Sequence, residues 1–467
     1  MFEVSVALRT WSAGSEVLMQ LRRLSTSTLR SYDFKVRPEN QGTQRALRHF
    51  DEFYAGVYGD LWPSVRLALL CPNKPCAMPN PFLSEHSAVW KQLRELGALS
   101  LRALCARRAQ TAAGTVAQEG PSLELTEPPP EAEKDAQDVE EGSFFDESSR
   151  YMPGGGPSSS SSLLSFVPSS RMVFQEEQVD EAGYRNFYRP DSQLRLPLKQ
   201  WTPEGEGALF PGRLDAALFG MGDISTFPSP RRSGTSRLLD YYLLDAASLL
   251  PVLALDLQKG DDVADLCAAP GGKLLATVFT GLAGSIVACD ASASRVQRLR
   301  ECLQSYLPEK QLQGISVLHR DLLRPGNMAQ HSFDRILLDV PCTNDRLSVA
   351  EDDNNWFSHK RLQERLTLPQ RQVELLGRAL SLLRPGGSLV YSTCSLSPMQ
   401  NDGVVHMALQ ELWQQSGTAE YAVVDLSVAF APVPFRFFEG CRYGQLALPF
   451  LPQNVGPLYV ARIERIR

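Results

Sequence analysis

A short glycine-containing stretch, residues 261–273, constrains the fold of this 467-residue chain more than any other part of it. The mostly apolar run from Val263 to Leu266 leads into Ala-Ala-Pro-Gly-Gly-Lys, and a helical pattern follows. A strand, a tight glycine-rich turn and a helix in this order open a nucleotide-binding α/β unit. Gly271 and Gly272 carry no Cβ, so the backbone of this turn can approach a ligand closely. The stretch therefore predicts a binding site at the end of a strand in an α/β sheet.

Strand and helix patterns alternate after this stretch. Strands are predicted near 262–267, 286–290, 315–319, 334–340 and 387–393, and helices near 272–281, 292–306, 366–383 and 400–414. Five strands alternating with helices imply a mostly parallel, doubly wound sheet, which is the Rossmann-like architecture. Later strand patterns, at 421–425, 445–450 and 457–463, suggest an antiparallel hairpin that closes one edge. Ligands bind at the carboxyl ends of the strands in such sheets, so we expect the functional residues there.

Residues 1–31 have the composition of a mitochondrial transit peptide. They contain four arginines, many serines and threonines, and only two acidic residues. This composition is typical of import into mitochondria, although an ordinary flexible basic terminus has the same character. The chain contains no uninterrupted apolar window of about 18 residues, so we expect no membrane-spanning helix. These features predict a protein of the mitochondrial matrix.

Two segments are predicted before the core domain, and one helix is predicted at its start. Residues 42–107 carry apolar side chains at helical spacing, which predicts an N-terminal helical region that either caps the core or positions a substrate or partner. Residues 110–170 are rich in acidic residues, serine, glycine and proline, which predicts a disordered insertion. A catalytic domain is expected over 215–465. Within it, helical spacing at 238–250 predicts a helix that Pro251 ends or kinks.

Charge and cysteine content limit the classes of partner and site. The net charge is −6, but residues 115–150 alone carry eleven acidic and two basic side chains, so the rest of the chain is at about +3. Phosphate contacts normally dominate nucleic-acid affinity, so a near-neutral body that bound nucleic acid would need either a local basic face or a partner that supplies the remaining affinity. Nine scattered cysteines without a Cys-x-x-Cys pair, and six isolated histidines, predict neither a disulfide framework nor a metal site.

Acidic residues follow the second and third predicted strands. Asp290 lies nineteen residues after Gly271, which is about the distance at which an acidic side chain accepts hydrogen bonds from a ribose diol. Asp321 could meet an adenine amine, with Leu322 beside it offering a backbone N–H and an apolar contact. Since the turn lacks G-x-G-x-x-G, S-adenosylmethionine is favoured over NAD. A lone aspartate at a strand end can also be a helix cap, and Arg295 is either a cofactor contact or a surface arginine.

Two cysteines end the two central predicted strands, in Asp-Val-Pro-Cys342 and in Tyr-Ser-Thr-Cys394-Ser. Together with residues 261–273, these motifs resemble those of the Nop/Sun-type RNA cytosine-5 methyltransferases, and the resemblance covers about residues 215–465. DNA cytosine-5 enzymes use only the fourth-strand Pro-Cys. Pro-Cys-Thr-Asn-Asp-Arg, Glu-Asp-Asp-Asn-Asn-Trp and an N-terminal Gly-Asp-Leu-Trp-Pro most resemble the mitochondrial ribosomal-RNA member. The long acidic insertion, and Leu322 where glycine is more typical, depart from the family pattern.

The resemblance implies a role for each site residue. Cys394 would be the nucleophile, because a thiolate that adds to C6 of cytosine makes C5 reactive toward an electrophilic methyl group. Its thiol must lose a proton, and Lys273 could supply the positive charge that this requires. Asp339 would hydrogen-bond N3 and the exocyclic amine, and Cys342 would assist release. Lys273 and Asp339 are also expected beside the cofactor, and the target base must be flipped out or unpaired to reach the pocket.

The function implied is S-adenosylmethionine-dependent methylation of cytosine C5 in mitochondrial small-subunit ribosomal RNA, in support of ribosome assembly. The resemblance also implies two partners, the mitochondrial ribosomal subunit and a helical-repeat protein of the mitochondrial termination-factor type. One alternative is a mitochondrial transfer-RNA target, although no added RNA-binding domain is evident. A second alternative is an assembly factor whose methylation is dispensable.

Overall fold

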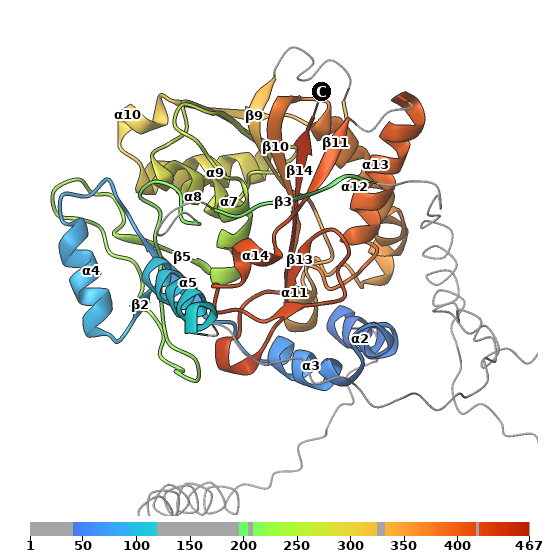
Figure 1. Cartoon of the computed structure of the whole chain (residues 1–467), viewed down its shortest axis with the longest axis horizontal. Helices are drawn as coiled ribbons and strands as arrows, with labels where there is room; N and C mark the ends of the chain where they lie inside the picture. The colour runs from blue at the N-terminus through green and yellow to red at the C-terminus, as the bar shows by residue number, and fades with distance from the viewer. Residues whose placement is uncertain (1–40, 119–195, 204–208, 325–331, 417–419, 467) are drawn as a thin grey trace, which may run out of the picture.

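The computed structural model describes residues 41–118, 196–203, 209–324, 332–416 and 420–466 (Figure 1). The transit peptide predicted at 1–31 lies outside the described residues, as does the part of the predicted insertion after residue 118. The start of that insertion at residue 110 is wrong, because helix α5 (Leu101–Gln118) continues through it. Alanine, arginine and glutamine, which favour helices, make up much of this segment. None of the helices in the described ranges has the length and apolar character needed to cross a bilayer.

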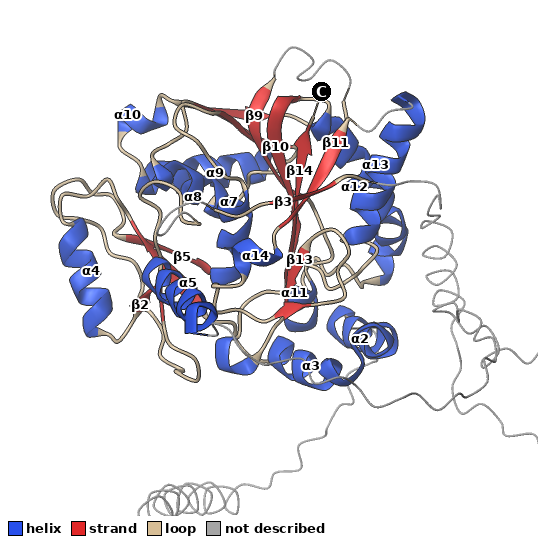
Figure 2. Cartoon of the chain, viewed as in Figure 1, coloured by secondary structure: helices blue, strands red, loops and turns tan. Residues whose placement is uncertain are grey.

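The core of the molecule is a mostly parallel sheet (Figures 1 and 2). Strands β8, β7, β6, β9 and β10 lie side by side in this order and run in the same direction. Their bounds are Asp262–Asp265 for β6, Ser285–Asp290 for β7, Ile315–His319 for β8, Phe333–Asp339 for β9 and Leu383–Thr393 for β10. The chain order reverses between β6 and β9, and the carboxyl ends of strands at such a reversal frame the ligand site.

Helices cover both faces of this sheet (Figure 2). Apolar side chains of α7 (Leu250–Ala254), α8 (Gly272–Thr280) and α9 (Ala293–Tyr306) pack on one face. Those of α12 (Leu362–Leu380) and α13 (Asp402–Ser416) pack on the other. The predicted doubly wound, Rossmann-like α/β sheet is therefore confirmed, with its five core strands and four core helices close to their predicted positions.

One edge of the sheet is antiparallel. Strand β14 (Leu458–Arg465) lies between β10 on one side and both β11 (Tyr421–Asp425) and β13 (Gln445–Ala447) on the other. The strands themselves are predicted from the sequence, but as a hairpin that closes the edge, whereas β14 lies between other strands. Most of β14 is buried, which suits a position inside a sheet better than an edge position. Two short strands, β12 (Phe437–Phe438) and β3 (Leu198–Gln200), extend this side.

A second, small sheet combines the N-terminal region with the segment before the core. Its strand order is β2 (Leu99–Ser100), β4 (Ala217–Leu218), β1 (Pro75–Pro79) and β5 (Tyr241–Asp245). Each neighbouring pair in it is antiparallel. The region predicted as helical over 42–107 therefore also supplies two strands, and its chain is joined to the following domain by backbone pairing.

The helix predicted at 238–250 is wrong in its first part. Strand β5 occupies 241–245, and η2 (Ala246–Leu249) and α7 follow it. Every residue of β5 pairs with β1, so tertiary pairing overrides the helical spacing of the apolar residues. Asp245 Oδ1 accepts a hydrogen bond from the N–H of Ala247 (2.8 Å) and caps η2. Pro251 lies in the first turn of α7, where a missing N–H costs little, and it does not end that helix.

Helix α2 (Gly42–Tyr58) forms the start of the described chain (Figure 1). Its buried residues, Gly42, Ala46, Phe50, Tyr54 and Tyr58, recur at intervals of four and so form one buried stripe. The stripe packs on α11 (Asp345–Ala350), which follows β9. The remaining short elements are η1 (Gly59–Leu61), α3 (Trp62–Leu70), α4 (His86–Glu95), α10 (Glu309–Leu312), α14 (Ser427–Phe430), η3 (His359–Arg361) and η4 (Leu451–Gln453).

Candidate active site

The two cysteines predicted at neighbouring strand ends lie in contact. Cys342 follows β9 and Cys394 follows β10, and these strands pair in parallel up to Asp339 opposite Ser392. The backbone N–H of Cys394 donates a hydrogen bond to Sγ of Cys342, with 3.2 Å between the two atoms. Both residues are partly buried. The pair therefore presents two thiols at a single point on the carboxyl edge of the sheet.

Lys273 and Asp339 form an ion pair at the same edge. Lys273, in the first turn of α8, places its Nζ 2.8 Å from Asp339 Oδ2, and the Ser392 hydroxyl donates to Asp339 Oδ1 over 2.7 Å. Burial alone would lower the pKa of Lys273, but the Asp339 carboxylate and the nearby Cys394 thiol raise it above its usual value. Lys273 is therefore a cation, and the carboxylate of Asp339 is held in a fixed orientation by two donors.

The Cys394 thiol is not activated by this arrangement alone. Its hydrogen bond with Cys342 and its burial raise the pKa of Cys394 well above the ordinary value of a thiol, whereas the Lys273 charge lowers it. The positive charge expected from the sequence is present. It is outweighed because the neighbouring thiol and the low-dielectric surroundings both favour the neutral form.

The glycines of the Ala-Pro-Gly-Gly turn are required by packing within the protein. Gly271 has a φ of +119°, and a Cβ there would lie 2.8 Å from the Leu299 side chain of α9. A Cβ on Gly272 would lie 3.1 Å from the Tyr242 ring of β5. The sequence predicts that these glycines allow a ligand to approach the backbone closely. The structure shows that α9 and β5 occupy the space beside them, so the turn is held close to both elements.

Asp290 and Arg295 lie beside this turn. Asp290, the last residue of β7, is 3% exposed, and its Oδ1 accepts from the N–H of Ser292 over 3.0 Å. Its Oδ2 is buried with no hydrogen-bond partner and lies 3.4 Å from Nη2 of Arg295. The Arg295 guanidinium donates instead to the carbonyl of Ala269 and so ties α9 to the turn. A buried carboxylate oxygen without a donor fits a ligand that brings hydroxyl groups, as the ribose of S-adenosylmethionine does.

Asp321 and Leu322 lie at the end of β8, farther along the same edge. Oδ1 of Asp321 accepts from the N–H of Leu323 over 3.1 Å, so the carboxylate shapes its own turn. Leu322 is 4% exposed, and its side chain packs in the apolar cluster that contains Leu266 and Val340. Its side chain therefore belongs to the core.

Sequence reasoning missed Asp265, the last residue of β6. It is 1% exposed and its Oδ1 has no hydrogen-bond partner. Burial and, second, the nearby Asp339 carboxylate raise the pKa of Asp265 to about 7. The signal that could have revealed it is an acidic residue within the short apolar run that leads to the glycine-rich turn, from which Leu266 and Cys267 separate it.

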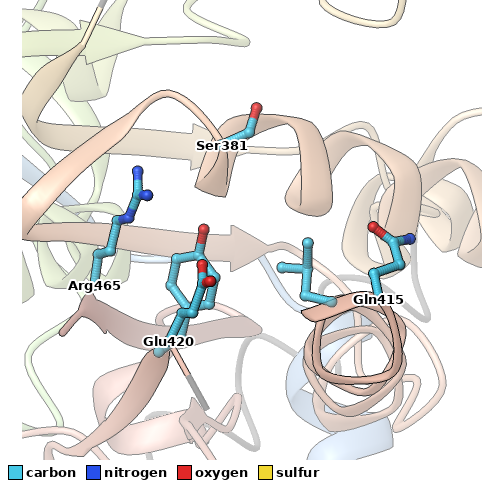
Figure 3. A pocket seen from close by; sticks show the side chains of 6 residues that line it. Ser381, Gln415, Glu420 and Arg465 are labelled. Atoms are coloured by element: carbon cyan, nitrogen blue, oxygen red, sulfur yellow. The ribbon is translucent and has the colours of Figure 1, made fainter. Parts of the chain in front are cut away.

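One surface pocket lies away from these residues (Figure 3). It is lined by Ser381, Leu412, Gln415, Glu420, Tyr421 and Arg465. Arg465 ends β14 and pairs with Tyr421, at the end of β10 opposite Cys394. The pocket therefore lies at the amino edge of the parallel strands. In the described part of the chain, no group of three or more His, Cys, Asp or Glu side chains could hold a metal ion.

The amino-acid sequence of this chain matches a known protein family and several of its members. A family model described as 16S rRNA methyltransferase RsmB/F matches residues 252–461. The 5-cytosine rRNA methyltransferase NSUN4 of Xenopus tropicalis is 36% identical over 462 residues, which cover 96% of this chain and 98% of that protein. The NSUN4 protein of Mus musculus is 35% identical over 94% of this chain and 95% of its own length. The mitochondrial tRNA (cytosine(34)-C(5))-methyltransferase of Mus musculus is 37% identical over 51% of this chain and 67% of its own length.

The fold and the two motifs define a class, the S-adenosylmethionine-dependent RNA cytosine-5 methyltransferases. Within it, this chain belongs to the Nop/Sun-type family that includes the RsmB/F and NSUN4 enzymes. The resemblance inferred from the two cysteine motifs and the glycine-rich turn is thereby confirmed, as are the class of enzyme and the cofactor that this family uses.

Proposed function

We propose that this protein methylates C5 of a cytosine in mitochondrial small-subunit ribosomal RNA. The observation that carries the reaction is the contact between the Cys394 N–H and Cys342 Sγ, which supports the action of both thiols on one base. The choice of ribosomal RNA is supported by the length of chain over which each kind of relative matches. The rRNA enzymes match nearly the whole chain, including the N-terminal region, whereas the mitochondrial tRNA enzyme matches about half of it.

In this proposal Cys394 is the nucleophile. Its thiolate forms a bond to C6, and the electron density moved to C5 takes the methyl group that the cofactor supplies. A base then takes the C5 proton, the electrons of the C5–H bond re-form the ring double bond, and the C6–S bond breaks to restore the thiolate. Cys342, in contact with Cys394, assists this release. The pKa of the Cys394 thiol is raised, so its proton must be lost as the base and cofactor assemble around it.

Asp339 and Lys273 act in this proposal on the base and on the charge at the site. The Asp339 carboxylate, held by Ser392 and Lys273, accepts from the exocyclic amine and so distinguishes cytosine from uracil. It can also accept from N3 once that atom gains a proton in the C6 adduct. The Lys273 cation offsets the negative charge of the thiolate. Because both side chains are already fixed, little reorganisation is needed when the base arrives.

The cofactor would be held around the glycine-rich turn. Asp290 offers Oδ2, which has no hydrogen-bond partner, to the ribose, and Gly271 and Gly272 place the backbone of the turn at the start of α8. Arg295 keeps that turn in place through the Ala269 carbonyl. The residues after β8 complete the cofactor site: Asp321 at the adenine amine and Leu322 through its backbone N–H.

The cellular setting is also part of the proposal. The composition of residues 1–31 and the mitochondrial tRNA enzyme among the relatives support a mitochondrial protein, and we place its work in the matrix. The near-neutral charge outside the acidic segment supports a partner that adds RNA affinity, for which a helical-repeat protein of the termination-factor type is suited. The RNA would be met in the mitochondrial ribosomal subunit during its assembly.

The substrate is tested by bisulfite mapping of mitochondrial RNAs from cells with and without the protein. Loss of one 5-methylcytosine in small-subunit ribosomal RNA is expected. Loss from a transfer RNA would instead establish the tRNA alternative. Complementation with Cys394→Ala then separates catalysis from assembly, since normal ribosome assembly without the methyl group would make methylation dispensable.

The cysteine roles are tested with two matched variants. Cys394→Ala should abolish methyl transfer while S-adenosylmethionine still binds. Cys342→Ala should accumulate a covalent protein–RNA adduct that denaturing gels reveal. Retained activity in Cys394→Ala would move the nucleophile to Cys342, and an absent adduct in Cys342→Ala would remove its role in release.

A further inference from the structure

Asp345 lies three residues after Cys342 and is fully buried, with no exposed surface. Its carboxylate accepts hydrogen bonds from the Thr343 hydroxyl over 2.6 Å, from the Leu396 N–H over 2.6 Å and from the Ser395 hydroxyl over 3.2 Å. A fourth donor is the hydroxyl of Tyr54, at 2.7 Å. A carboxylate offers about four acceptor positions, so all the acceptor positions of Asp345 are occupied.

These bonds join the two cysteine loops to each other. Thr343 directly follows Cys342, and Ser395 directly follows Cys394. The backbone N–H of Asp345 also donates to the carbonyl of Cys394 over 3.2 Å. One buried residue therefore holds the chain on the carboxyl side of both thiols.

The fourth donor comes from the N-terminal region. Tyr54 is 2% exposed and belongs to the buried stripe of α2, between Phe50 and Tyr58. The hydroxyl of Tyr58 donates to the carbonyl of Leu396 over 2.5 Å. Helix α2 is therefore hydrogen-bonded twice to the segment around Cys394, once through Asp345 and once directly.

We infer that Asp345, supported by Tyr54 of α2, is a positioning residue that sets the spacing of the two cysteine thiols. The inference rests on the proposed function, in which both thiols act on one base in successive steps. A change in spacing would then slow both adduct formation and adduct release. That pattern differs from the loss of Cys342, which slows release alone. Through the hydrogen bonds around Asp345, α2 then contributes to catalysis as well as covering the core.

The main variant is Tyr54→Phe, which removes one of the four donors and keeps the ring in place. The matched control is Tyr421→Phe, whose buried hydroxyl donates to the carbonyl of Leu380 over 3.3 Å at the opposite end of the sheet. Tyr54→Phe should lower kcat by about tenfold or more and leave KM for RNA within about twofold, since sub-ångström displacement of reacting groups acts on the chemical steps. Both single-turnover steps, adduct formation and its resolution, should slow. The control should match wild type in each.

A second variant, Asp345→Asn, sharpens the test. Its amide offers one acceptor oxygen and turns an NH2 group toward existing donors, so it should lower kcat further than Tyr54→Phe does. If Asp345→Asn fails to fold, Tyr54→Phe alone decides the outcome. Wild-type kcat in Tyr54→Phe, with only a lower melting temperature, would make the network merely structural. A raised KM with unchanged kcat would assign α2 to RNA binding and would also overturn the inference.

A measurement without RNA separates this inference from the proposed function. Alkylation of Cys394, followed by mass spectrometry at fixed pH, reports the thiol contact directly. Tyr54→Phe should weaken that contact and speed alkylation of Cys394 several-fold, whereas Tyr421→Phe should not. If wild type methylates no cytosine but this difference is present, the proposed function fails and the positioning network stands. If the rates are equal, the inference fails whatever the substrate is.

Discussion

The Cys394 thiol has two neighbours with opposite effects on its ionisation. The hydrogen bond with Cys342 raises its pKa, and the charge of Lys273 lowers it. The structure therefore holds the Cys394 thiol neutral but close to a cation that can stabilise its anion. Such a thiol is protected from adventitious electrophiles until its surroundings change, because the thiolate is the reactive form.

The two effects predict opposite changes in reactivity. Cys342→Ala removes the hydrogen bond that raises the pKa of Cys394, so alkylation of Cys394 near pH 8 should become faster. Lys273→Met removes the cation that lowers this pKa, so alkylation should become slower. Rates for the Cys394 peptide are measured by mass spectrometry, with the partly buried Cys71 as an internal reference. Equal rates in the two variants would contradict this account.

Asp265 is a second buried acid at the site, and its ionisation affects stability. The pKa of Asp265 is raised from about 3.8 to about 7 in the folded protein, first by burial and then by the Asp339 carboxylate. Between these two values the folded state binds more protons than the unfolded state. The stability that this group contributes is therefore fully present below pH 4 and is lost as the pH rises to 7.

Asp265→Asn removes this dependence. The variant should gain stability relative to wild type as the pH rises from 4 to 7, by a difference on the order of 4 kcal/mol that stays constant above pH 7. Urea unfolding of both proteins at a series of pH values measures the difference directly. A difference that does not change with pH would mean that Asp265 has an ordinary pKa.

At the scale of secondary-structure elements, α2 is the element that ties the N-terminal region to the site. Phe50 has no exposed surface, and its ring packs edge-on against Phe357 with 5.1 Å between centroids. The N–H of Thr43 donates to Asp352 over 2.9 Å, and Arg45 donates to the carbonyl of Phe357 over 2.8 Å. The helix therefore holds the loop that follows α11.

Phe50→Ala should weaken this contact strongly. Loss of a buried phenylalanine ring costs about 3–5 kcal/mol, because it removes apolar burial and leaves a cavity. Leu67→Ala is the matched control, since Leu67 of α3 is 52% exposed and its loss should cost less than about 0.5 kcal/mol. Denaturant unfolding gives both values. A cost below about 1 kcal/mol for Phe50→Ala would show that α2 is dispensable for the fold.

Elements with strong periodicity could be predicted from the sequence, and contacts between distant segments could not. The core strands have local apolar patterns, and their order follows from right-handed crossover connections. Hence Cys342 and Cys394 could be predicted at neighbouring strand ends. Strand β5 was mistaken for a helix because its pairing with β1 is not visible locally. Asp345 stands in the motif that begins at Pro341, and Tyr54 has helical apolar spacing, but only the fold shows that the two side chains meet.

At the scale of the whole molecule, charge is divided between a nearly neutral body and an acidic segment. Residues 115–150 carry a charge of −9 in a chain whose net charge is −6. RNA is a polyanion, so an acidic segment on the same chain repels it at distances up to about one Debye length, roughly 10 Å at 0.1 M salt. We therefore expect the segment to lower the affinity of the isolated protein for RNA.

Deletion of residues 119–150 should tighten RNA binding at low salt. The affinity gain should be several-fold at 50 mM salt and should disappear near 500 mM, because salt screens the repulsion. Filter binding with one small-subunit RNA fragment measures it. A variant in which the eleven acidic residues are replaced by Gln or Asn keeps the length of the segment and should show the same gain. Unchanged affinity in both variants would exclude an electrostatic role.

The position of β14 has a consequence for synthesis of the protein. This strand flanks β10 along the stretch that leads to Cys394, yet it is translated after α13, β11 and β13. While the chain is still emerging from the translating ribosome, β10 has a partner on its β9 side only. Strand β10 therefore gains its second partner late in translation, and a message truncated before β14 yields a chain in which the strand that precedes Cys394 forms an open edge of the sheet.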